Sequence, residues 1–396
     1  MNVHALSLYR PAWEEGGRRV AGPDEDVLTL AVAAARPLAE RHEVRRVVVL
    51  TPNPDVLEGF GTGVVARALG LGDDTPVELR VGGAAAALAA LLDAGKGSLV
   101  VGVDLTAQAA AAGAAWIWDG PGLSLDLAGS VHGSLPMRVR HTGSPEAAVY
   151  GDARVERDLA TAPLVERLRG TGPISIVGTT ASEAKRLGAR PVASTQGPAG
   201  VIFALAALSA ADENSRLVAL DAASACAADV GSSVVELLDD EVPGVPAAQR
   251  PSIAQVVEVP FSMPAYARAF EAKIGLEAAK CSCGTVSFPP RQLCLECGRS
   301  DDTTPIPLPR TGEIYTSVKV HVPIPGIAGP YSLAIVALDE SPVRVLAQVA
   351  DVGAREPAIG ERGRLVLRRV AIREGVPDYG YAFQSEVTPL EERRTA

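Results

Sequence analysis

The sequence has few of the features that define several large classes of protein. Its 396 residues include only five cysteines, and aromatic residues make up 4% of the chain. No apolar run reaches the roughly 20 residues of a membrane-spanning helix. Residues 1–20 lack the basic segment and apolar core of a secretion signal. We therefore expect no membrane association and no disulfide framework, and we expect a reducing, cytoplasmic location.

A basic surface is also missing, since the formal net charge is -10. Nucleic-acid binding requires positive charge against the phosphates and aromatic side chains for stacking on bases. The sequence supplies neither in quantity, so we expect no nucleic-acid partner.

Hydrophobic residues nevertheless make up 47% of the chain, which is enough for large cores. Apolar runs typical of buried strands alternate with helical patterns, and this alternation occurs twice. The strands are expected at 45–51, 98–103, 114–118, 174–177 and 216–220, and the helices at 27–38, 61–70, 84–94, 181–187 and 198–211. We predict a layered α/β domain over residues 1–242 with a largely parallel sheet.

The pattern changes near residue 240. Prolines punctuate residues 243–275, which we interpret as a linker with a short helix at 265–274. Short alternating strands are expected at 331–338, 343–349 and 363–370, so residues 305–396 are predicted to form a small all-β barrel.

Four of the five cysteines lie together in the intervening segment, residues 276–304. Cys281 and Cys283 enclose one residue, Cys294 and Cys297 enclose two, and a glycine follows each pair. Paired thiolates at such spacing can complete a tetrahedron around Zn²⁺. A closed four-thiolate set has no open position for substrate, so we predict a structural zinc ribbon. Free or disulfide-bonded cysteines are the alternative.

Several motifs around these cysteines resemble the zinc-ribbon/OB-fold family that accompanies thiolases and hydroxymethylglutaryl-CoA synthases. They are the Cys-Ser-Cys-Gly motif at 281–284, Phe-Pro-Pro-Arg at 288–291, Gly-Glu-Ile-Tyr-Thr at 312–316 and Tyr-Gly-Tyr-Ala-Phe at 379–383. The resemblance implies a rubredoxin-like ribbon followed by an OB-fold barrel that bridges partner enzymes or handles acyl-CoA. Arg364, Arg368 and Arg369 could then contact CoA phosphates. Alternatively, Arg364 and Arg368 form only the solvent face of a strand.

The N-terminal region resembles the hydroxymethylglutaryl-CoA synthase branch of the thiolase superfamily, through residues 22–36, 65–72 and 196–200. That resemblance implies a thiolase-like αβα domain whose chemistry uses a cysteine, a histidine and an asparagine. The corresponding positions here carry Val81 (or Gly82), Gly178 and Gln196. The family's acyl-enzyme route therefore lacks its catalytic residues.

Other residues offer weaker catalytic candidates. Cys226 lies among alanines and is more typical of a small buried hydrophobe than of a nucleophile. His132 and His141 are expected in loops, and Asp104 could cap a helix as readily as serve as an acid.

These features leave three functions open. The first is an accessory, non-catalytic subunit of a thiolase-type complex acting on acyl-CoA or carrier-bound acyl groups. Such a subunit would form a homodimer or a hetero-oligomer with a catalytically complete thiolase or synthase. The second is an acyltransferase, synthase or aldolase-like enzyme that works without the cysteine, histidine and asparagine. The third is an assembly protein that binds no acyl ligand.

Overall fold

The computed structural model describes residues 1–54, 61–134, 137–139, 148–150, 152, 154, 156–192, 195–211, 214–231, 235–239, 242–251, 260, 262–300, 302–322, 329–353 and 355–386. These form two compact units, each built from segments distant in sequence. The first contains Met1–Arg10, Ala34–Thr62 and Asp73–Asp240, and the second contains Pro11–Ala33, Gly63–Gly72 and Glu241–Ala396. The second unit thus takes in two N-terminal segments that the predicted boundary at residue 242 had placed elsewhere.

An 11-stranded sheet forms the first unit, with the order β12-β11-β13-β14-β8-β1-β7-β6-β4-β5 and with β15 paired to β1. Its strands are β1 (Asn2–Tyr9), β4 (Arg46–Thr51), β5 (Val77–Val81), β6 (Ser98–Leu105), β7 (Ala110–Ile117), β8 (Leu123–His132), β11 (Ile174–Val177), β12 (Arg190–Pro191), β13 (Ser215–Leu220), β14 (Ser224–Val230) and β15 (Glu236–Asp239). A separate hairpin contains β9 (Met137–Val139) and β10 (Ala148–Tyr150).

The two halves of this sheet have the same arrangement of strands. Outward from the central antiparallel pair β1–β8, one half runs β7-β6-β4-β5 and the other runs β14-β13-β11-β12. In each half the three outer strands are parallel, and the strand next to the centre is antiparallel to its neighbours. The expectation of a largely parallel sheet was therefore wrong. Strand β7 follows β6 through the short Thr106–Ala109 turn, and so tight a connection permits only antiparallel pairing.

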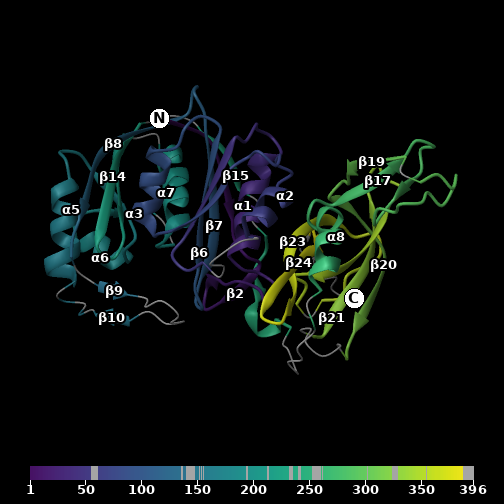
Figure 1. Cartoon of the computed structure of the whole chain (residues 1–396). Helices are drawn as coiled ribbons and strands as arrows, with labels where there is room; N and C mark the ends of the chain where they lie inside the picture. The colour runs from purple at the N-terminus through teal and green to yellow at the C-terminus, as the bar shows by residue number, and fades with distance from the viewer. Residues whose placement is uncertain are drawn as a thin grey trace, which may run out of the picture. The chain divides into compact units, whose positions relative to one another are not determined.

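Helices cover the sheet in layers, as the thiolase-like resemblance predicted. Those that lie wholly in this unit are α3 (Ala84–Leu92), α5 (Ala162–Leu168), α6 (Ala181–Arg186), α7 (Pro198–Ala211) and the π-helical turn Glu156–Thr161, whereas α1 (Val27–Ala39) and α2 (Gly61–Ala68) each have residues in both units. Helices α3 and α7 pack against each other and share one core with strands from both halves (Figure 1). Helices α5 and α6 cover a second core beside β11 and β13. Helix α7 is apolar on all sides, and ten of its 14 residues are buried.

The second unit contains a closed barrel of order β20-β21-β22-β24-β23 (Figure 1). Its strands are β20 (Thr311–Val320), β21 (Tyr331–Leu338), β22 (Arg344–Ala350), β23 (Arg362–Arg373) and β24 (Val376–Ser385). Alternate residues of these strands, including Ile314, Val336, Leu365 and Phe383, fill the barrel core.

Smaller elements complete this unit. Helix α8 (Met263–Ile274) corresponds to the short helix expected in the linker. The ribbon contains β17 (Glu277–Cys281), β18 (Val286–Ser287) and β19 (Thr303–Pro307). The N-terminal hairpin of β2 (Trp13–Glu15) and β3 (Arg18–Arg19) pairs with β16 (Val245–Pro246), which the 3₁₀ turn Ala247–Gln249 follows. Among the described residues, no helix has the length and apolarity required to cross a membrane.

Candidate functional site

The four ribbon cysteines form the cluster that the sequence predicted. Their sulfur atoms all lie within 4.8 Å of one another. The Sγ atoms of Cys281 and Cys297 are 3.6 Å apart, as are those of Cys283 and Cys294. A tetrahedral ion with metal–sulfur bonds of about 2.3 Å requires sulfur atoms about 3.8 Å apart. The separation is too long for a disulfide, so the donor set fits a tetrahedral metal ion.

Backbone geometry at the two knuckles explains how this spacing arises. Gly284 and Gly298 adopt positive φ angles of 94° and 70°, which glycine accommodates without strain. Their amides donate to the carbonyls of Cys281 and Cys294, which closes each turn. Beside the first knuckle, the hydroxyl of Thr285 lowers the pKa of Cys283 to about 6, whereas burial and the other three cysteines raise the pKa of Cys297 to about 12.

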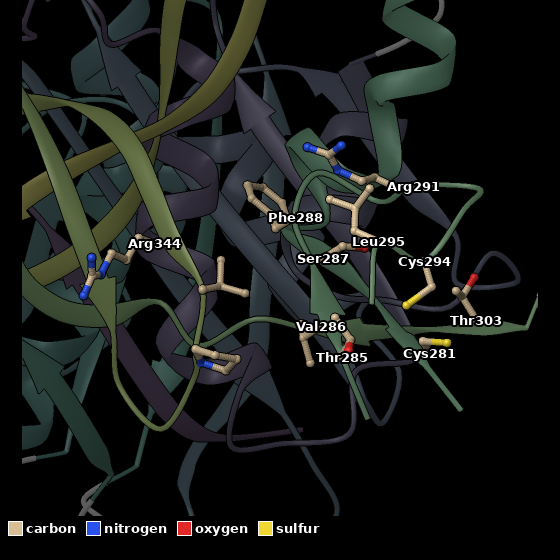
Figure 2. A pocket seen from close by; sticks show the side chains of 12 residues that line it. Cys281, Thr285, Val286, Ser287, Phe288, Arg291, Cys294, Leu295, Thr303 and Arg344 are labelled. Atoms are coloured by element: carbon tan, nitrogen blue, oxygen red, sulfur yellow. The ribbon is translucent and has the colours of Figure 1, made fainter. Parts of the chain in front are cut away.

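A cavity of about 280 Å³ lies next to this cluster, between the ribbon and the barrel turn before β22. Val286, Phe288 and Leu295 supply apolar walls, and Arg291 and Arg344 supply the positive charge. Figure 2 shows the sulfurs of Cys281 and Cys294 on the side away from Arg344. The Arg344 guanidinium stacks 3.8 Å from the ring centroid of Tyr315.

The beginning of α3, where the resemblance places a catalytic cysteine, is occupied by a carboxylate. Asp221 directly follows β13 and accepts hydrogen bonds from the amides of Ala85 and Ala86, at 3.1 and 3.3 Å. Burial raises the pKa of Asp221, and these amides oppose that shift. A Cβ at Gly83 would lie 2.1 Å from the Asp221 Oδ1 atom, and a Cβ at Gly82 would lie 2.4 Å from that of Ala86. Neither glycine has room for a cysteine.

The same arrangement occurs a second time with the roles of the two halves exchanged. Asp104, at the end of β6, accepts hydrogen bonds from the amides of Gly197 and Ala199 at the start of α7, at 3.0 and 3.1 Å. Burial raises the pKa of Asp104 to about 6. Each half therefore caps the central helix of the other half. The sequence indicated Asp104 as a possible cap but did not point to Asp221, although both acidic residues lie at the ends of corresponding strands.

The other two positions of the resemblance are equally unsuited to the expected chemistry. Gly178 has a φ angle of 95°, and a Cβ there would lie 2.1 Å from the carbonyl oxygen of Leu220, so a histidine has no room. Gln196 is exposed just before α7. Val81 ends the edge strand β5, and 71% of its surface is exposed.

The remaining candidates lie in different surroundings. Cys226 is buried in β14, where burial and the neighbouring charge of Asp221 raise its pKa to about 11, which suits an inert thiol. His132 is exposed at the end of β8 rather than in a loop. His141 lies outside the described residues.

The three arginines suggested for CoA phosphates differ in exposure. Arg364 contacts the amide oxygen of Gln384 at 3.4 Å. Arg369 donates to the carbonyl of Pro23 at 2.9 Å and keeps about a quarter of its side chain exposed. Arg368 is 1% exposed, so it does not lie on a solvent face as the alternative interpretation expected. The alternation along β23 breaks there because the guanidinium has buried carboxylates around it.

A four-thiolate ribbon followed by a five-stranded barrel defines a metal-ribbon/OB-fold module. Residues 306–368 match the family described as the C-terminal OB-fold domain of ChsH2, which confirms the predicted OB-fold. A DUF35 domain-containing scaffold protein of Methanocaldococcus jannaschii is 36% identical over 107 residues, which cover 26% of this chain and 75% of that protein. A second such protein, from Pyrococcus furiosus, is 35% identical over 129 residues, which cover 32% of this chain and 93% of that protein. The chain belongs to this family of DUF35 domain-containing proteins.

Solved structures are similar to a larger share of the chain than these relatives are. AbyA1, a tetronic acid condensing enzyme, has a TM-score of 0.44 and 19% identity, covering 58% of this chain and 100% of that one. The HMG synthase of the curacin biosynthetic pathway has a TM-score of 0.46 and 14% identity, covering 58% and 79%.

Proposed function

We propose that the chain is an accessory, non-catalytic subunit of a thiolase-type complex that forms or cleaves C–C bonds in acyl-CoA or carrier-bound acyl groups. The start of α3 carries this proposal. Thiolase-type chemistry needs a thiolate there, whereas this chain presents Gly83 packed on Asp221. Amides that could otherwise stabilise developing negative charge are hydrogen-bonded to Asp221. Membership of a family of scaffold proteins supports an assembly role.

The ribbon and the barrel would organise that complex. We infer that the bound metal is Zn²⁺ with a structural role, because a closed thiolate set suits zinc and leaves no coordination position for substrate. When bound, the ion would hold the two knuckles together. Arg364, whose guanidinium lies 3.4 Å from the amide oxygen of Gln384, is our candidate for a CoA phosphate contact.

The partner protomer would join at strand β5. This strand ends the sheet path, and its outer edge has no strand neighbour among the described residues. An exposed sheet edge offers backbone groups to another strand. Glu78 of β5 accepts hydrogen bonds from Arg46 and Arg80, so charges of both signs lie along this strand. A homodimer or a hetero-oligomer with a complete thiolase or synthase would both satisfy this edge.

Intact-mass spectrometry with turnover assays tests the accessory role. Purified chain incubated with short acyl-CoAs should gain no acyl adduct and should show no condensation or thiolysis above background. A complex recovered from the native cell through the tagged chain should show such activity. An adduct on Cys226, or turnover by the purified chain at enzymatic rates, would refute the proposal.

The raised pKa of Asp221 favours a second candidate, an enzyme that uses this carboxylate as a proton acceptor. In that case the purified chain is active, and Asp221→Asn abolishes turnover. A third candidate, an assembly protein without acyl ligand, is separated by calorimetry with CoA and acyl-CoA. Absence of binding at millimolar ligand would favour it, whereas the accessory role predicts binding that weakens in Arg364→Gln.

A further inference from the structure

A buried ionic cluster joins the barrel to residues 20–29, which we call the latch segment. Arg368 of β23 is 1% exposed, and its Nη2 atom lies 2.9 Å from Asp351 Oδ2 and 3.4 Å from Glu25 Oε1. Its Nε atom lies 3.5 Å from Asp24 Oδ2. The backbone amide of Arg369 donates to the carbonyl of Asp24 at 2.8 Å, which fixes the segment along the strand.

Acidic groups outnumber basic groups around this contact. Asp26 also belongs to the cluster: it accepts a hydrogen bond from the Tyr379 hydroxyl at 2.8 Å and lies 3.9 Å from Arg369 Nη1. Four carboxylates from the latch segment and the Asp351 loop thus face two guanidinium groups from β23. Full ionisation would leave uncompensated negative charge at a buried position, which is unfavourable in a medium of low dielectric constant.

The hydrogen bonds leave a place for a proton. Asp351 Oδ2 accepts from Arg368 and from Gln384 Nε2, at 2.9 and 2.8 Å. Asp351 Oδ1 is buried and accepts no hydrogen bond from the described residues. Glu25 has a fully buried side chain, and its Oε2 accepts from the Gly22 amide at 2.7 Å. A protonated carboxyl group facing Asp351 would both remove the excess charge and supply a donor.

We propose that this cluster is a proton-linked latch, in which residues 20–29 dock on the barrel together with a proton held between Glu25, Asp24 and Asp351. Burial and the charge of Asp351 raise the pKa of Glu25 to about 7, against the pull of Arg368. Burial likewise raises the pKa of Asp24 to about 6. Because Asp24 keeps a quarter of its side chain exposed, Glu25 is the group that governs docking.

The direction of the pH effect follows from these values. The docked state binds the proton more tightly than the released segment, so docking is strongest below the ordinary Glu pKa of 4.5 and weakens as pH rises through about 7. The difference between the ordinary Glu pKa of 4.5 and the value of about 7 in the docked state corresponds to a change of up to roughly 300-fold in the docking equilibrium. Between pH 5 and pH 8 we expect a weakening of about 10- to 100-fold. The latch does not depend on the proposed accessory function.

Hydrogen exchange of the full chain, corrected for the intrinsic rate at each pH, tests the latch. Protection of residues 20–29 should fall by about 10- to 100-fold from pH 5 to pH 8. Glu25→Gln, which mimics the protonated carboxyl group, should keep the pH 5 level of protection at pH 8. Glu313→Gln, at an exposed position on β20, should behave like the unaltered chain. Equal protection at both pH values, or loss of protection in Glu25→Gln at both, would overturn the proposal.

Discussion

The packing of Gly83 against Asp221 gives the sharpest test of whether the start of α3 has room for a side chain. Gly83 has φ -101° and ψ -150°, a conformation that an alanine can adopt, so only space opposes a side chain. The new Cβ would lie 2.1 Å from Asp221 Oδ1. Overpacking of this kind costs about 1–3 kcal/mol, and we expect Gly83→Ala to lose that much stability.

A double-mutant cycle pairs Gly83→Ala with Asp221→Ala, which removes the side chain that the new Cβ would meet. Asp221→Ala loses a cap that accepts from two amides of α3, which costs about 0.5–2 kcal/mol. It also opens the space that the Cβ at Gly83 needs. The double variant should therefore lose about 1–2 kcal/mol less than the sum of the single variants, because contacting residues couple on this scale.

Urea unfolding followed by tryptophan fluorescence would measure the cycle. A Trp13→Phe background confines the signal to Trp116 and Trp118 of the first unit. Gly95→Ala is a matched control, because its Cβ would meet nothing within 4 Å. Strict additivity of the two losses, or a Gly83→Ala variant as stable as Gly95→Ala, would refute the steric argument.

Three further outcomes are expected. Cys294→Ser should abolish stoichiometric zinc measured by plasma mass spectrometry, whereas Cys226→Ser, at the buried cysteine outside the ribbon, should retain it. Val81→Lys should reduce the oligomer fraction measured by light scattering, because it places a charge on the β5 edge. Leu127→Lys, a control at a residue that is 65% exposed, should leave the oligomer fraction unchanged. Equal effects of the two variants would exclude the β5 edge as the interface. Tyr379→Phe should destabilise the second unit by about 1–3 kcal/mol, since it removes the hydrogen bond from the Tyr379 hydroxyl to the buried, charged Asp26 carboxylate; an unchanged melting temperature would contradict this.

The sequence predicted elements whose burial is uniform and whose ends carry local signals. Strand β11 and helix α7 were expected at 174–177 and 198–211, where they occur. The ribbon cysteines could also be predicted from the sequence, because all four ligands lie close together in it. The direction of the strands could not be predicted, since an alanine-rich run such as β7 does not indicate whether its partner runs parallel or antiparallel.

Long-range polar contacts were beyond sequence reasoning for a different reason. The pattern of β23 predicts an exposed Arg368, and only the folded chain brings Glu25 and Asp351 to it. The caps supplied by Asp104 and Asp221 likewise depend on helices from the opposite half of the sheet. The equivalence of Asp104, near the end of β6, and Asp221, just after β13, becomes visible once the two halves of the sheet are compared.

The reciprocal caps also constrain how a nucleophile could return to this fold. A thiol at Val81 would lie on β5, before the first turn of α3, and would not meet the helix amides. A cysteine at Gly83 would collide with Asp221, and removal of Asp221 would leave the amides of α3 without their acceptor. A histidine at Gly178 would still face the backbone of Leu220, which no side-chain substitution can move aside. No single substitution at these positions therefore supplies a cysteine and a histidine together, and substitutions at Gly83, Asp221 and Gly178 each disturb existing contacts. The Asp221 carboxylate that fills this position also accepts hydrogen bonds from two amides of α3 in the other half of the sheet, so opening the position by removing Asp221 would cost stability.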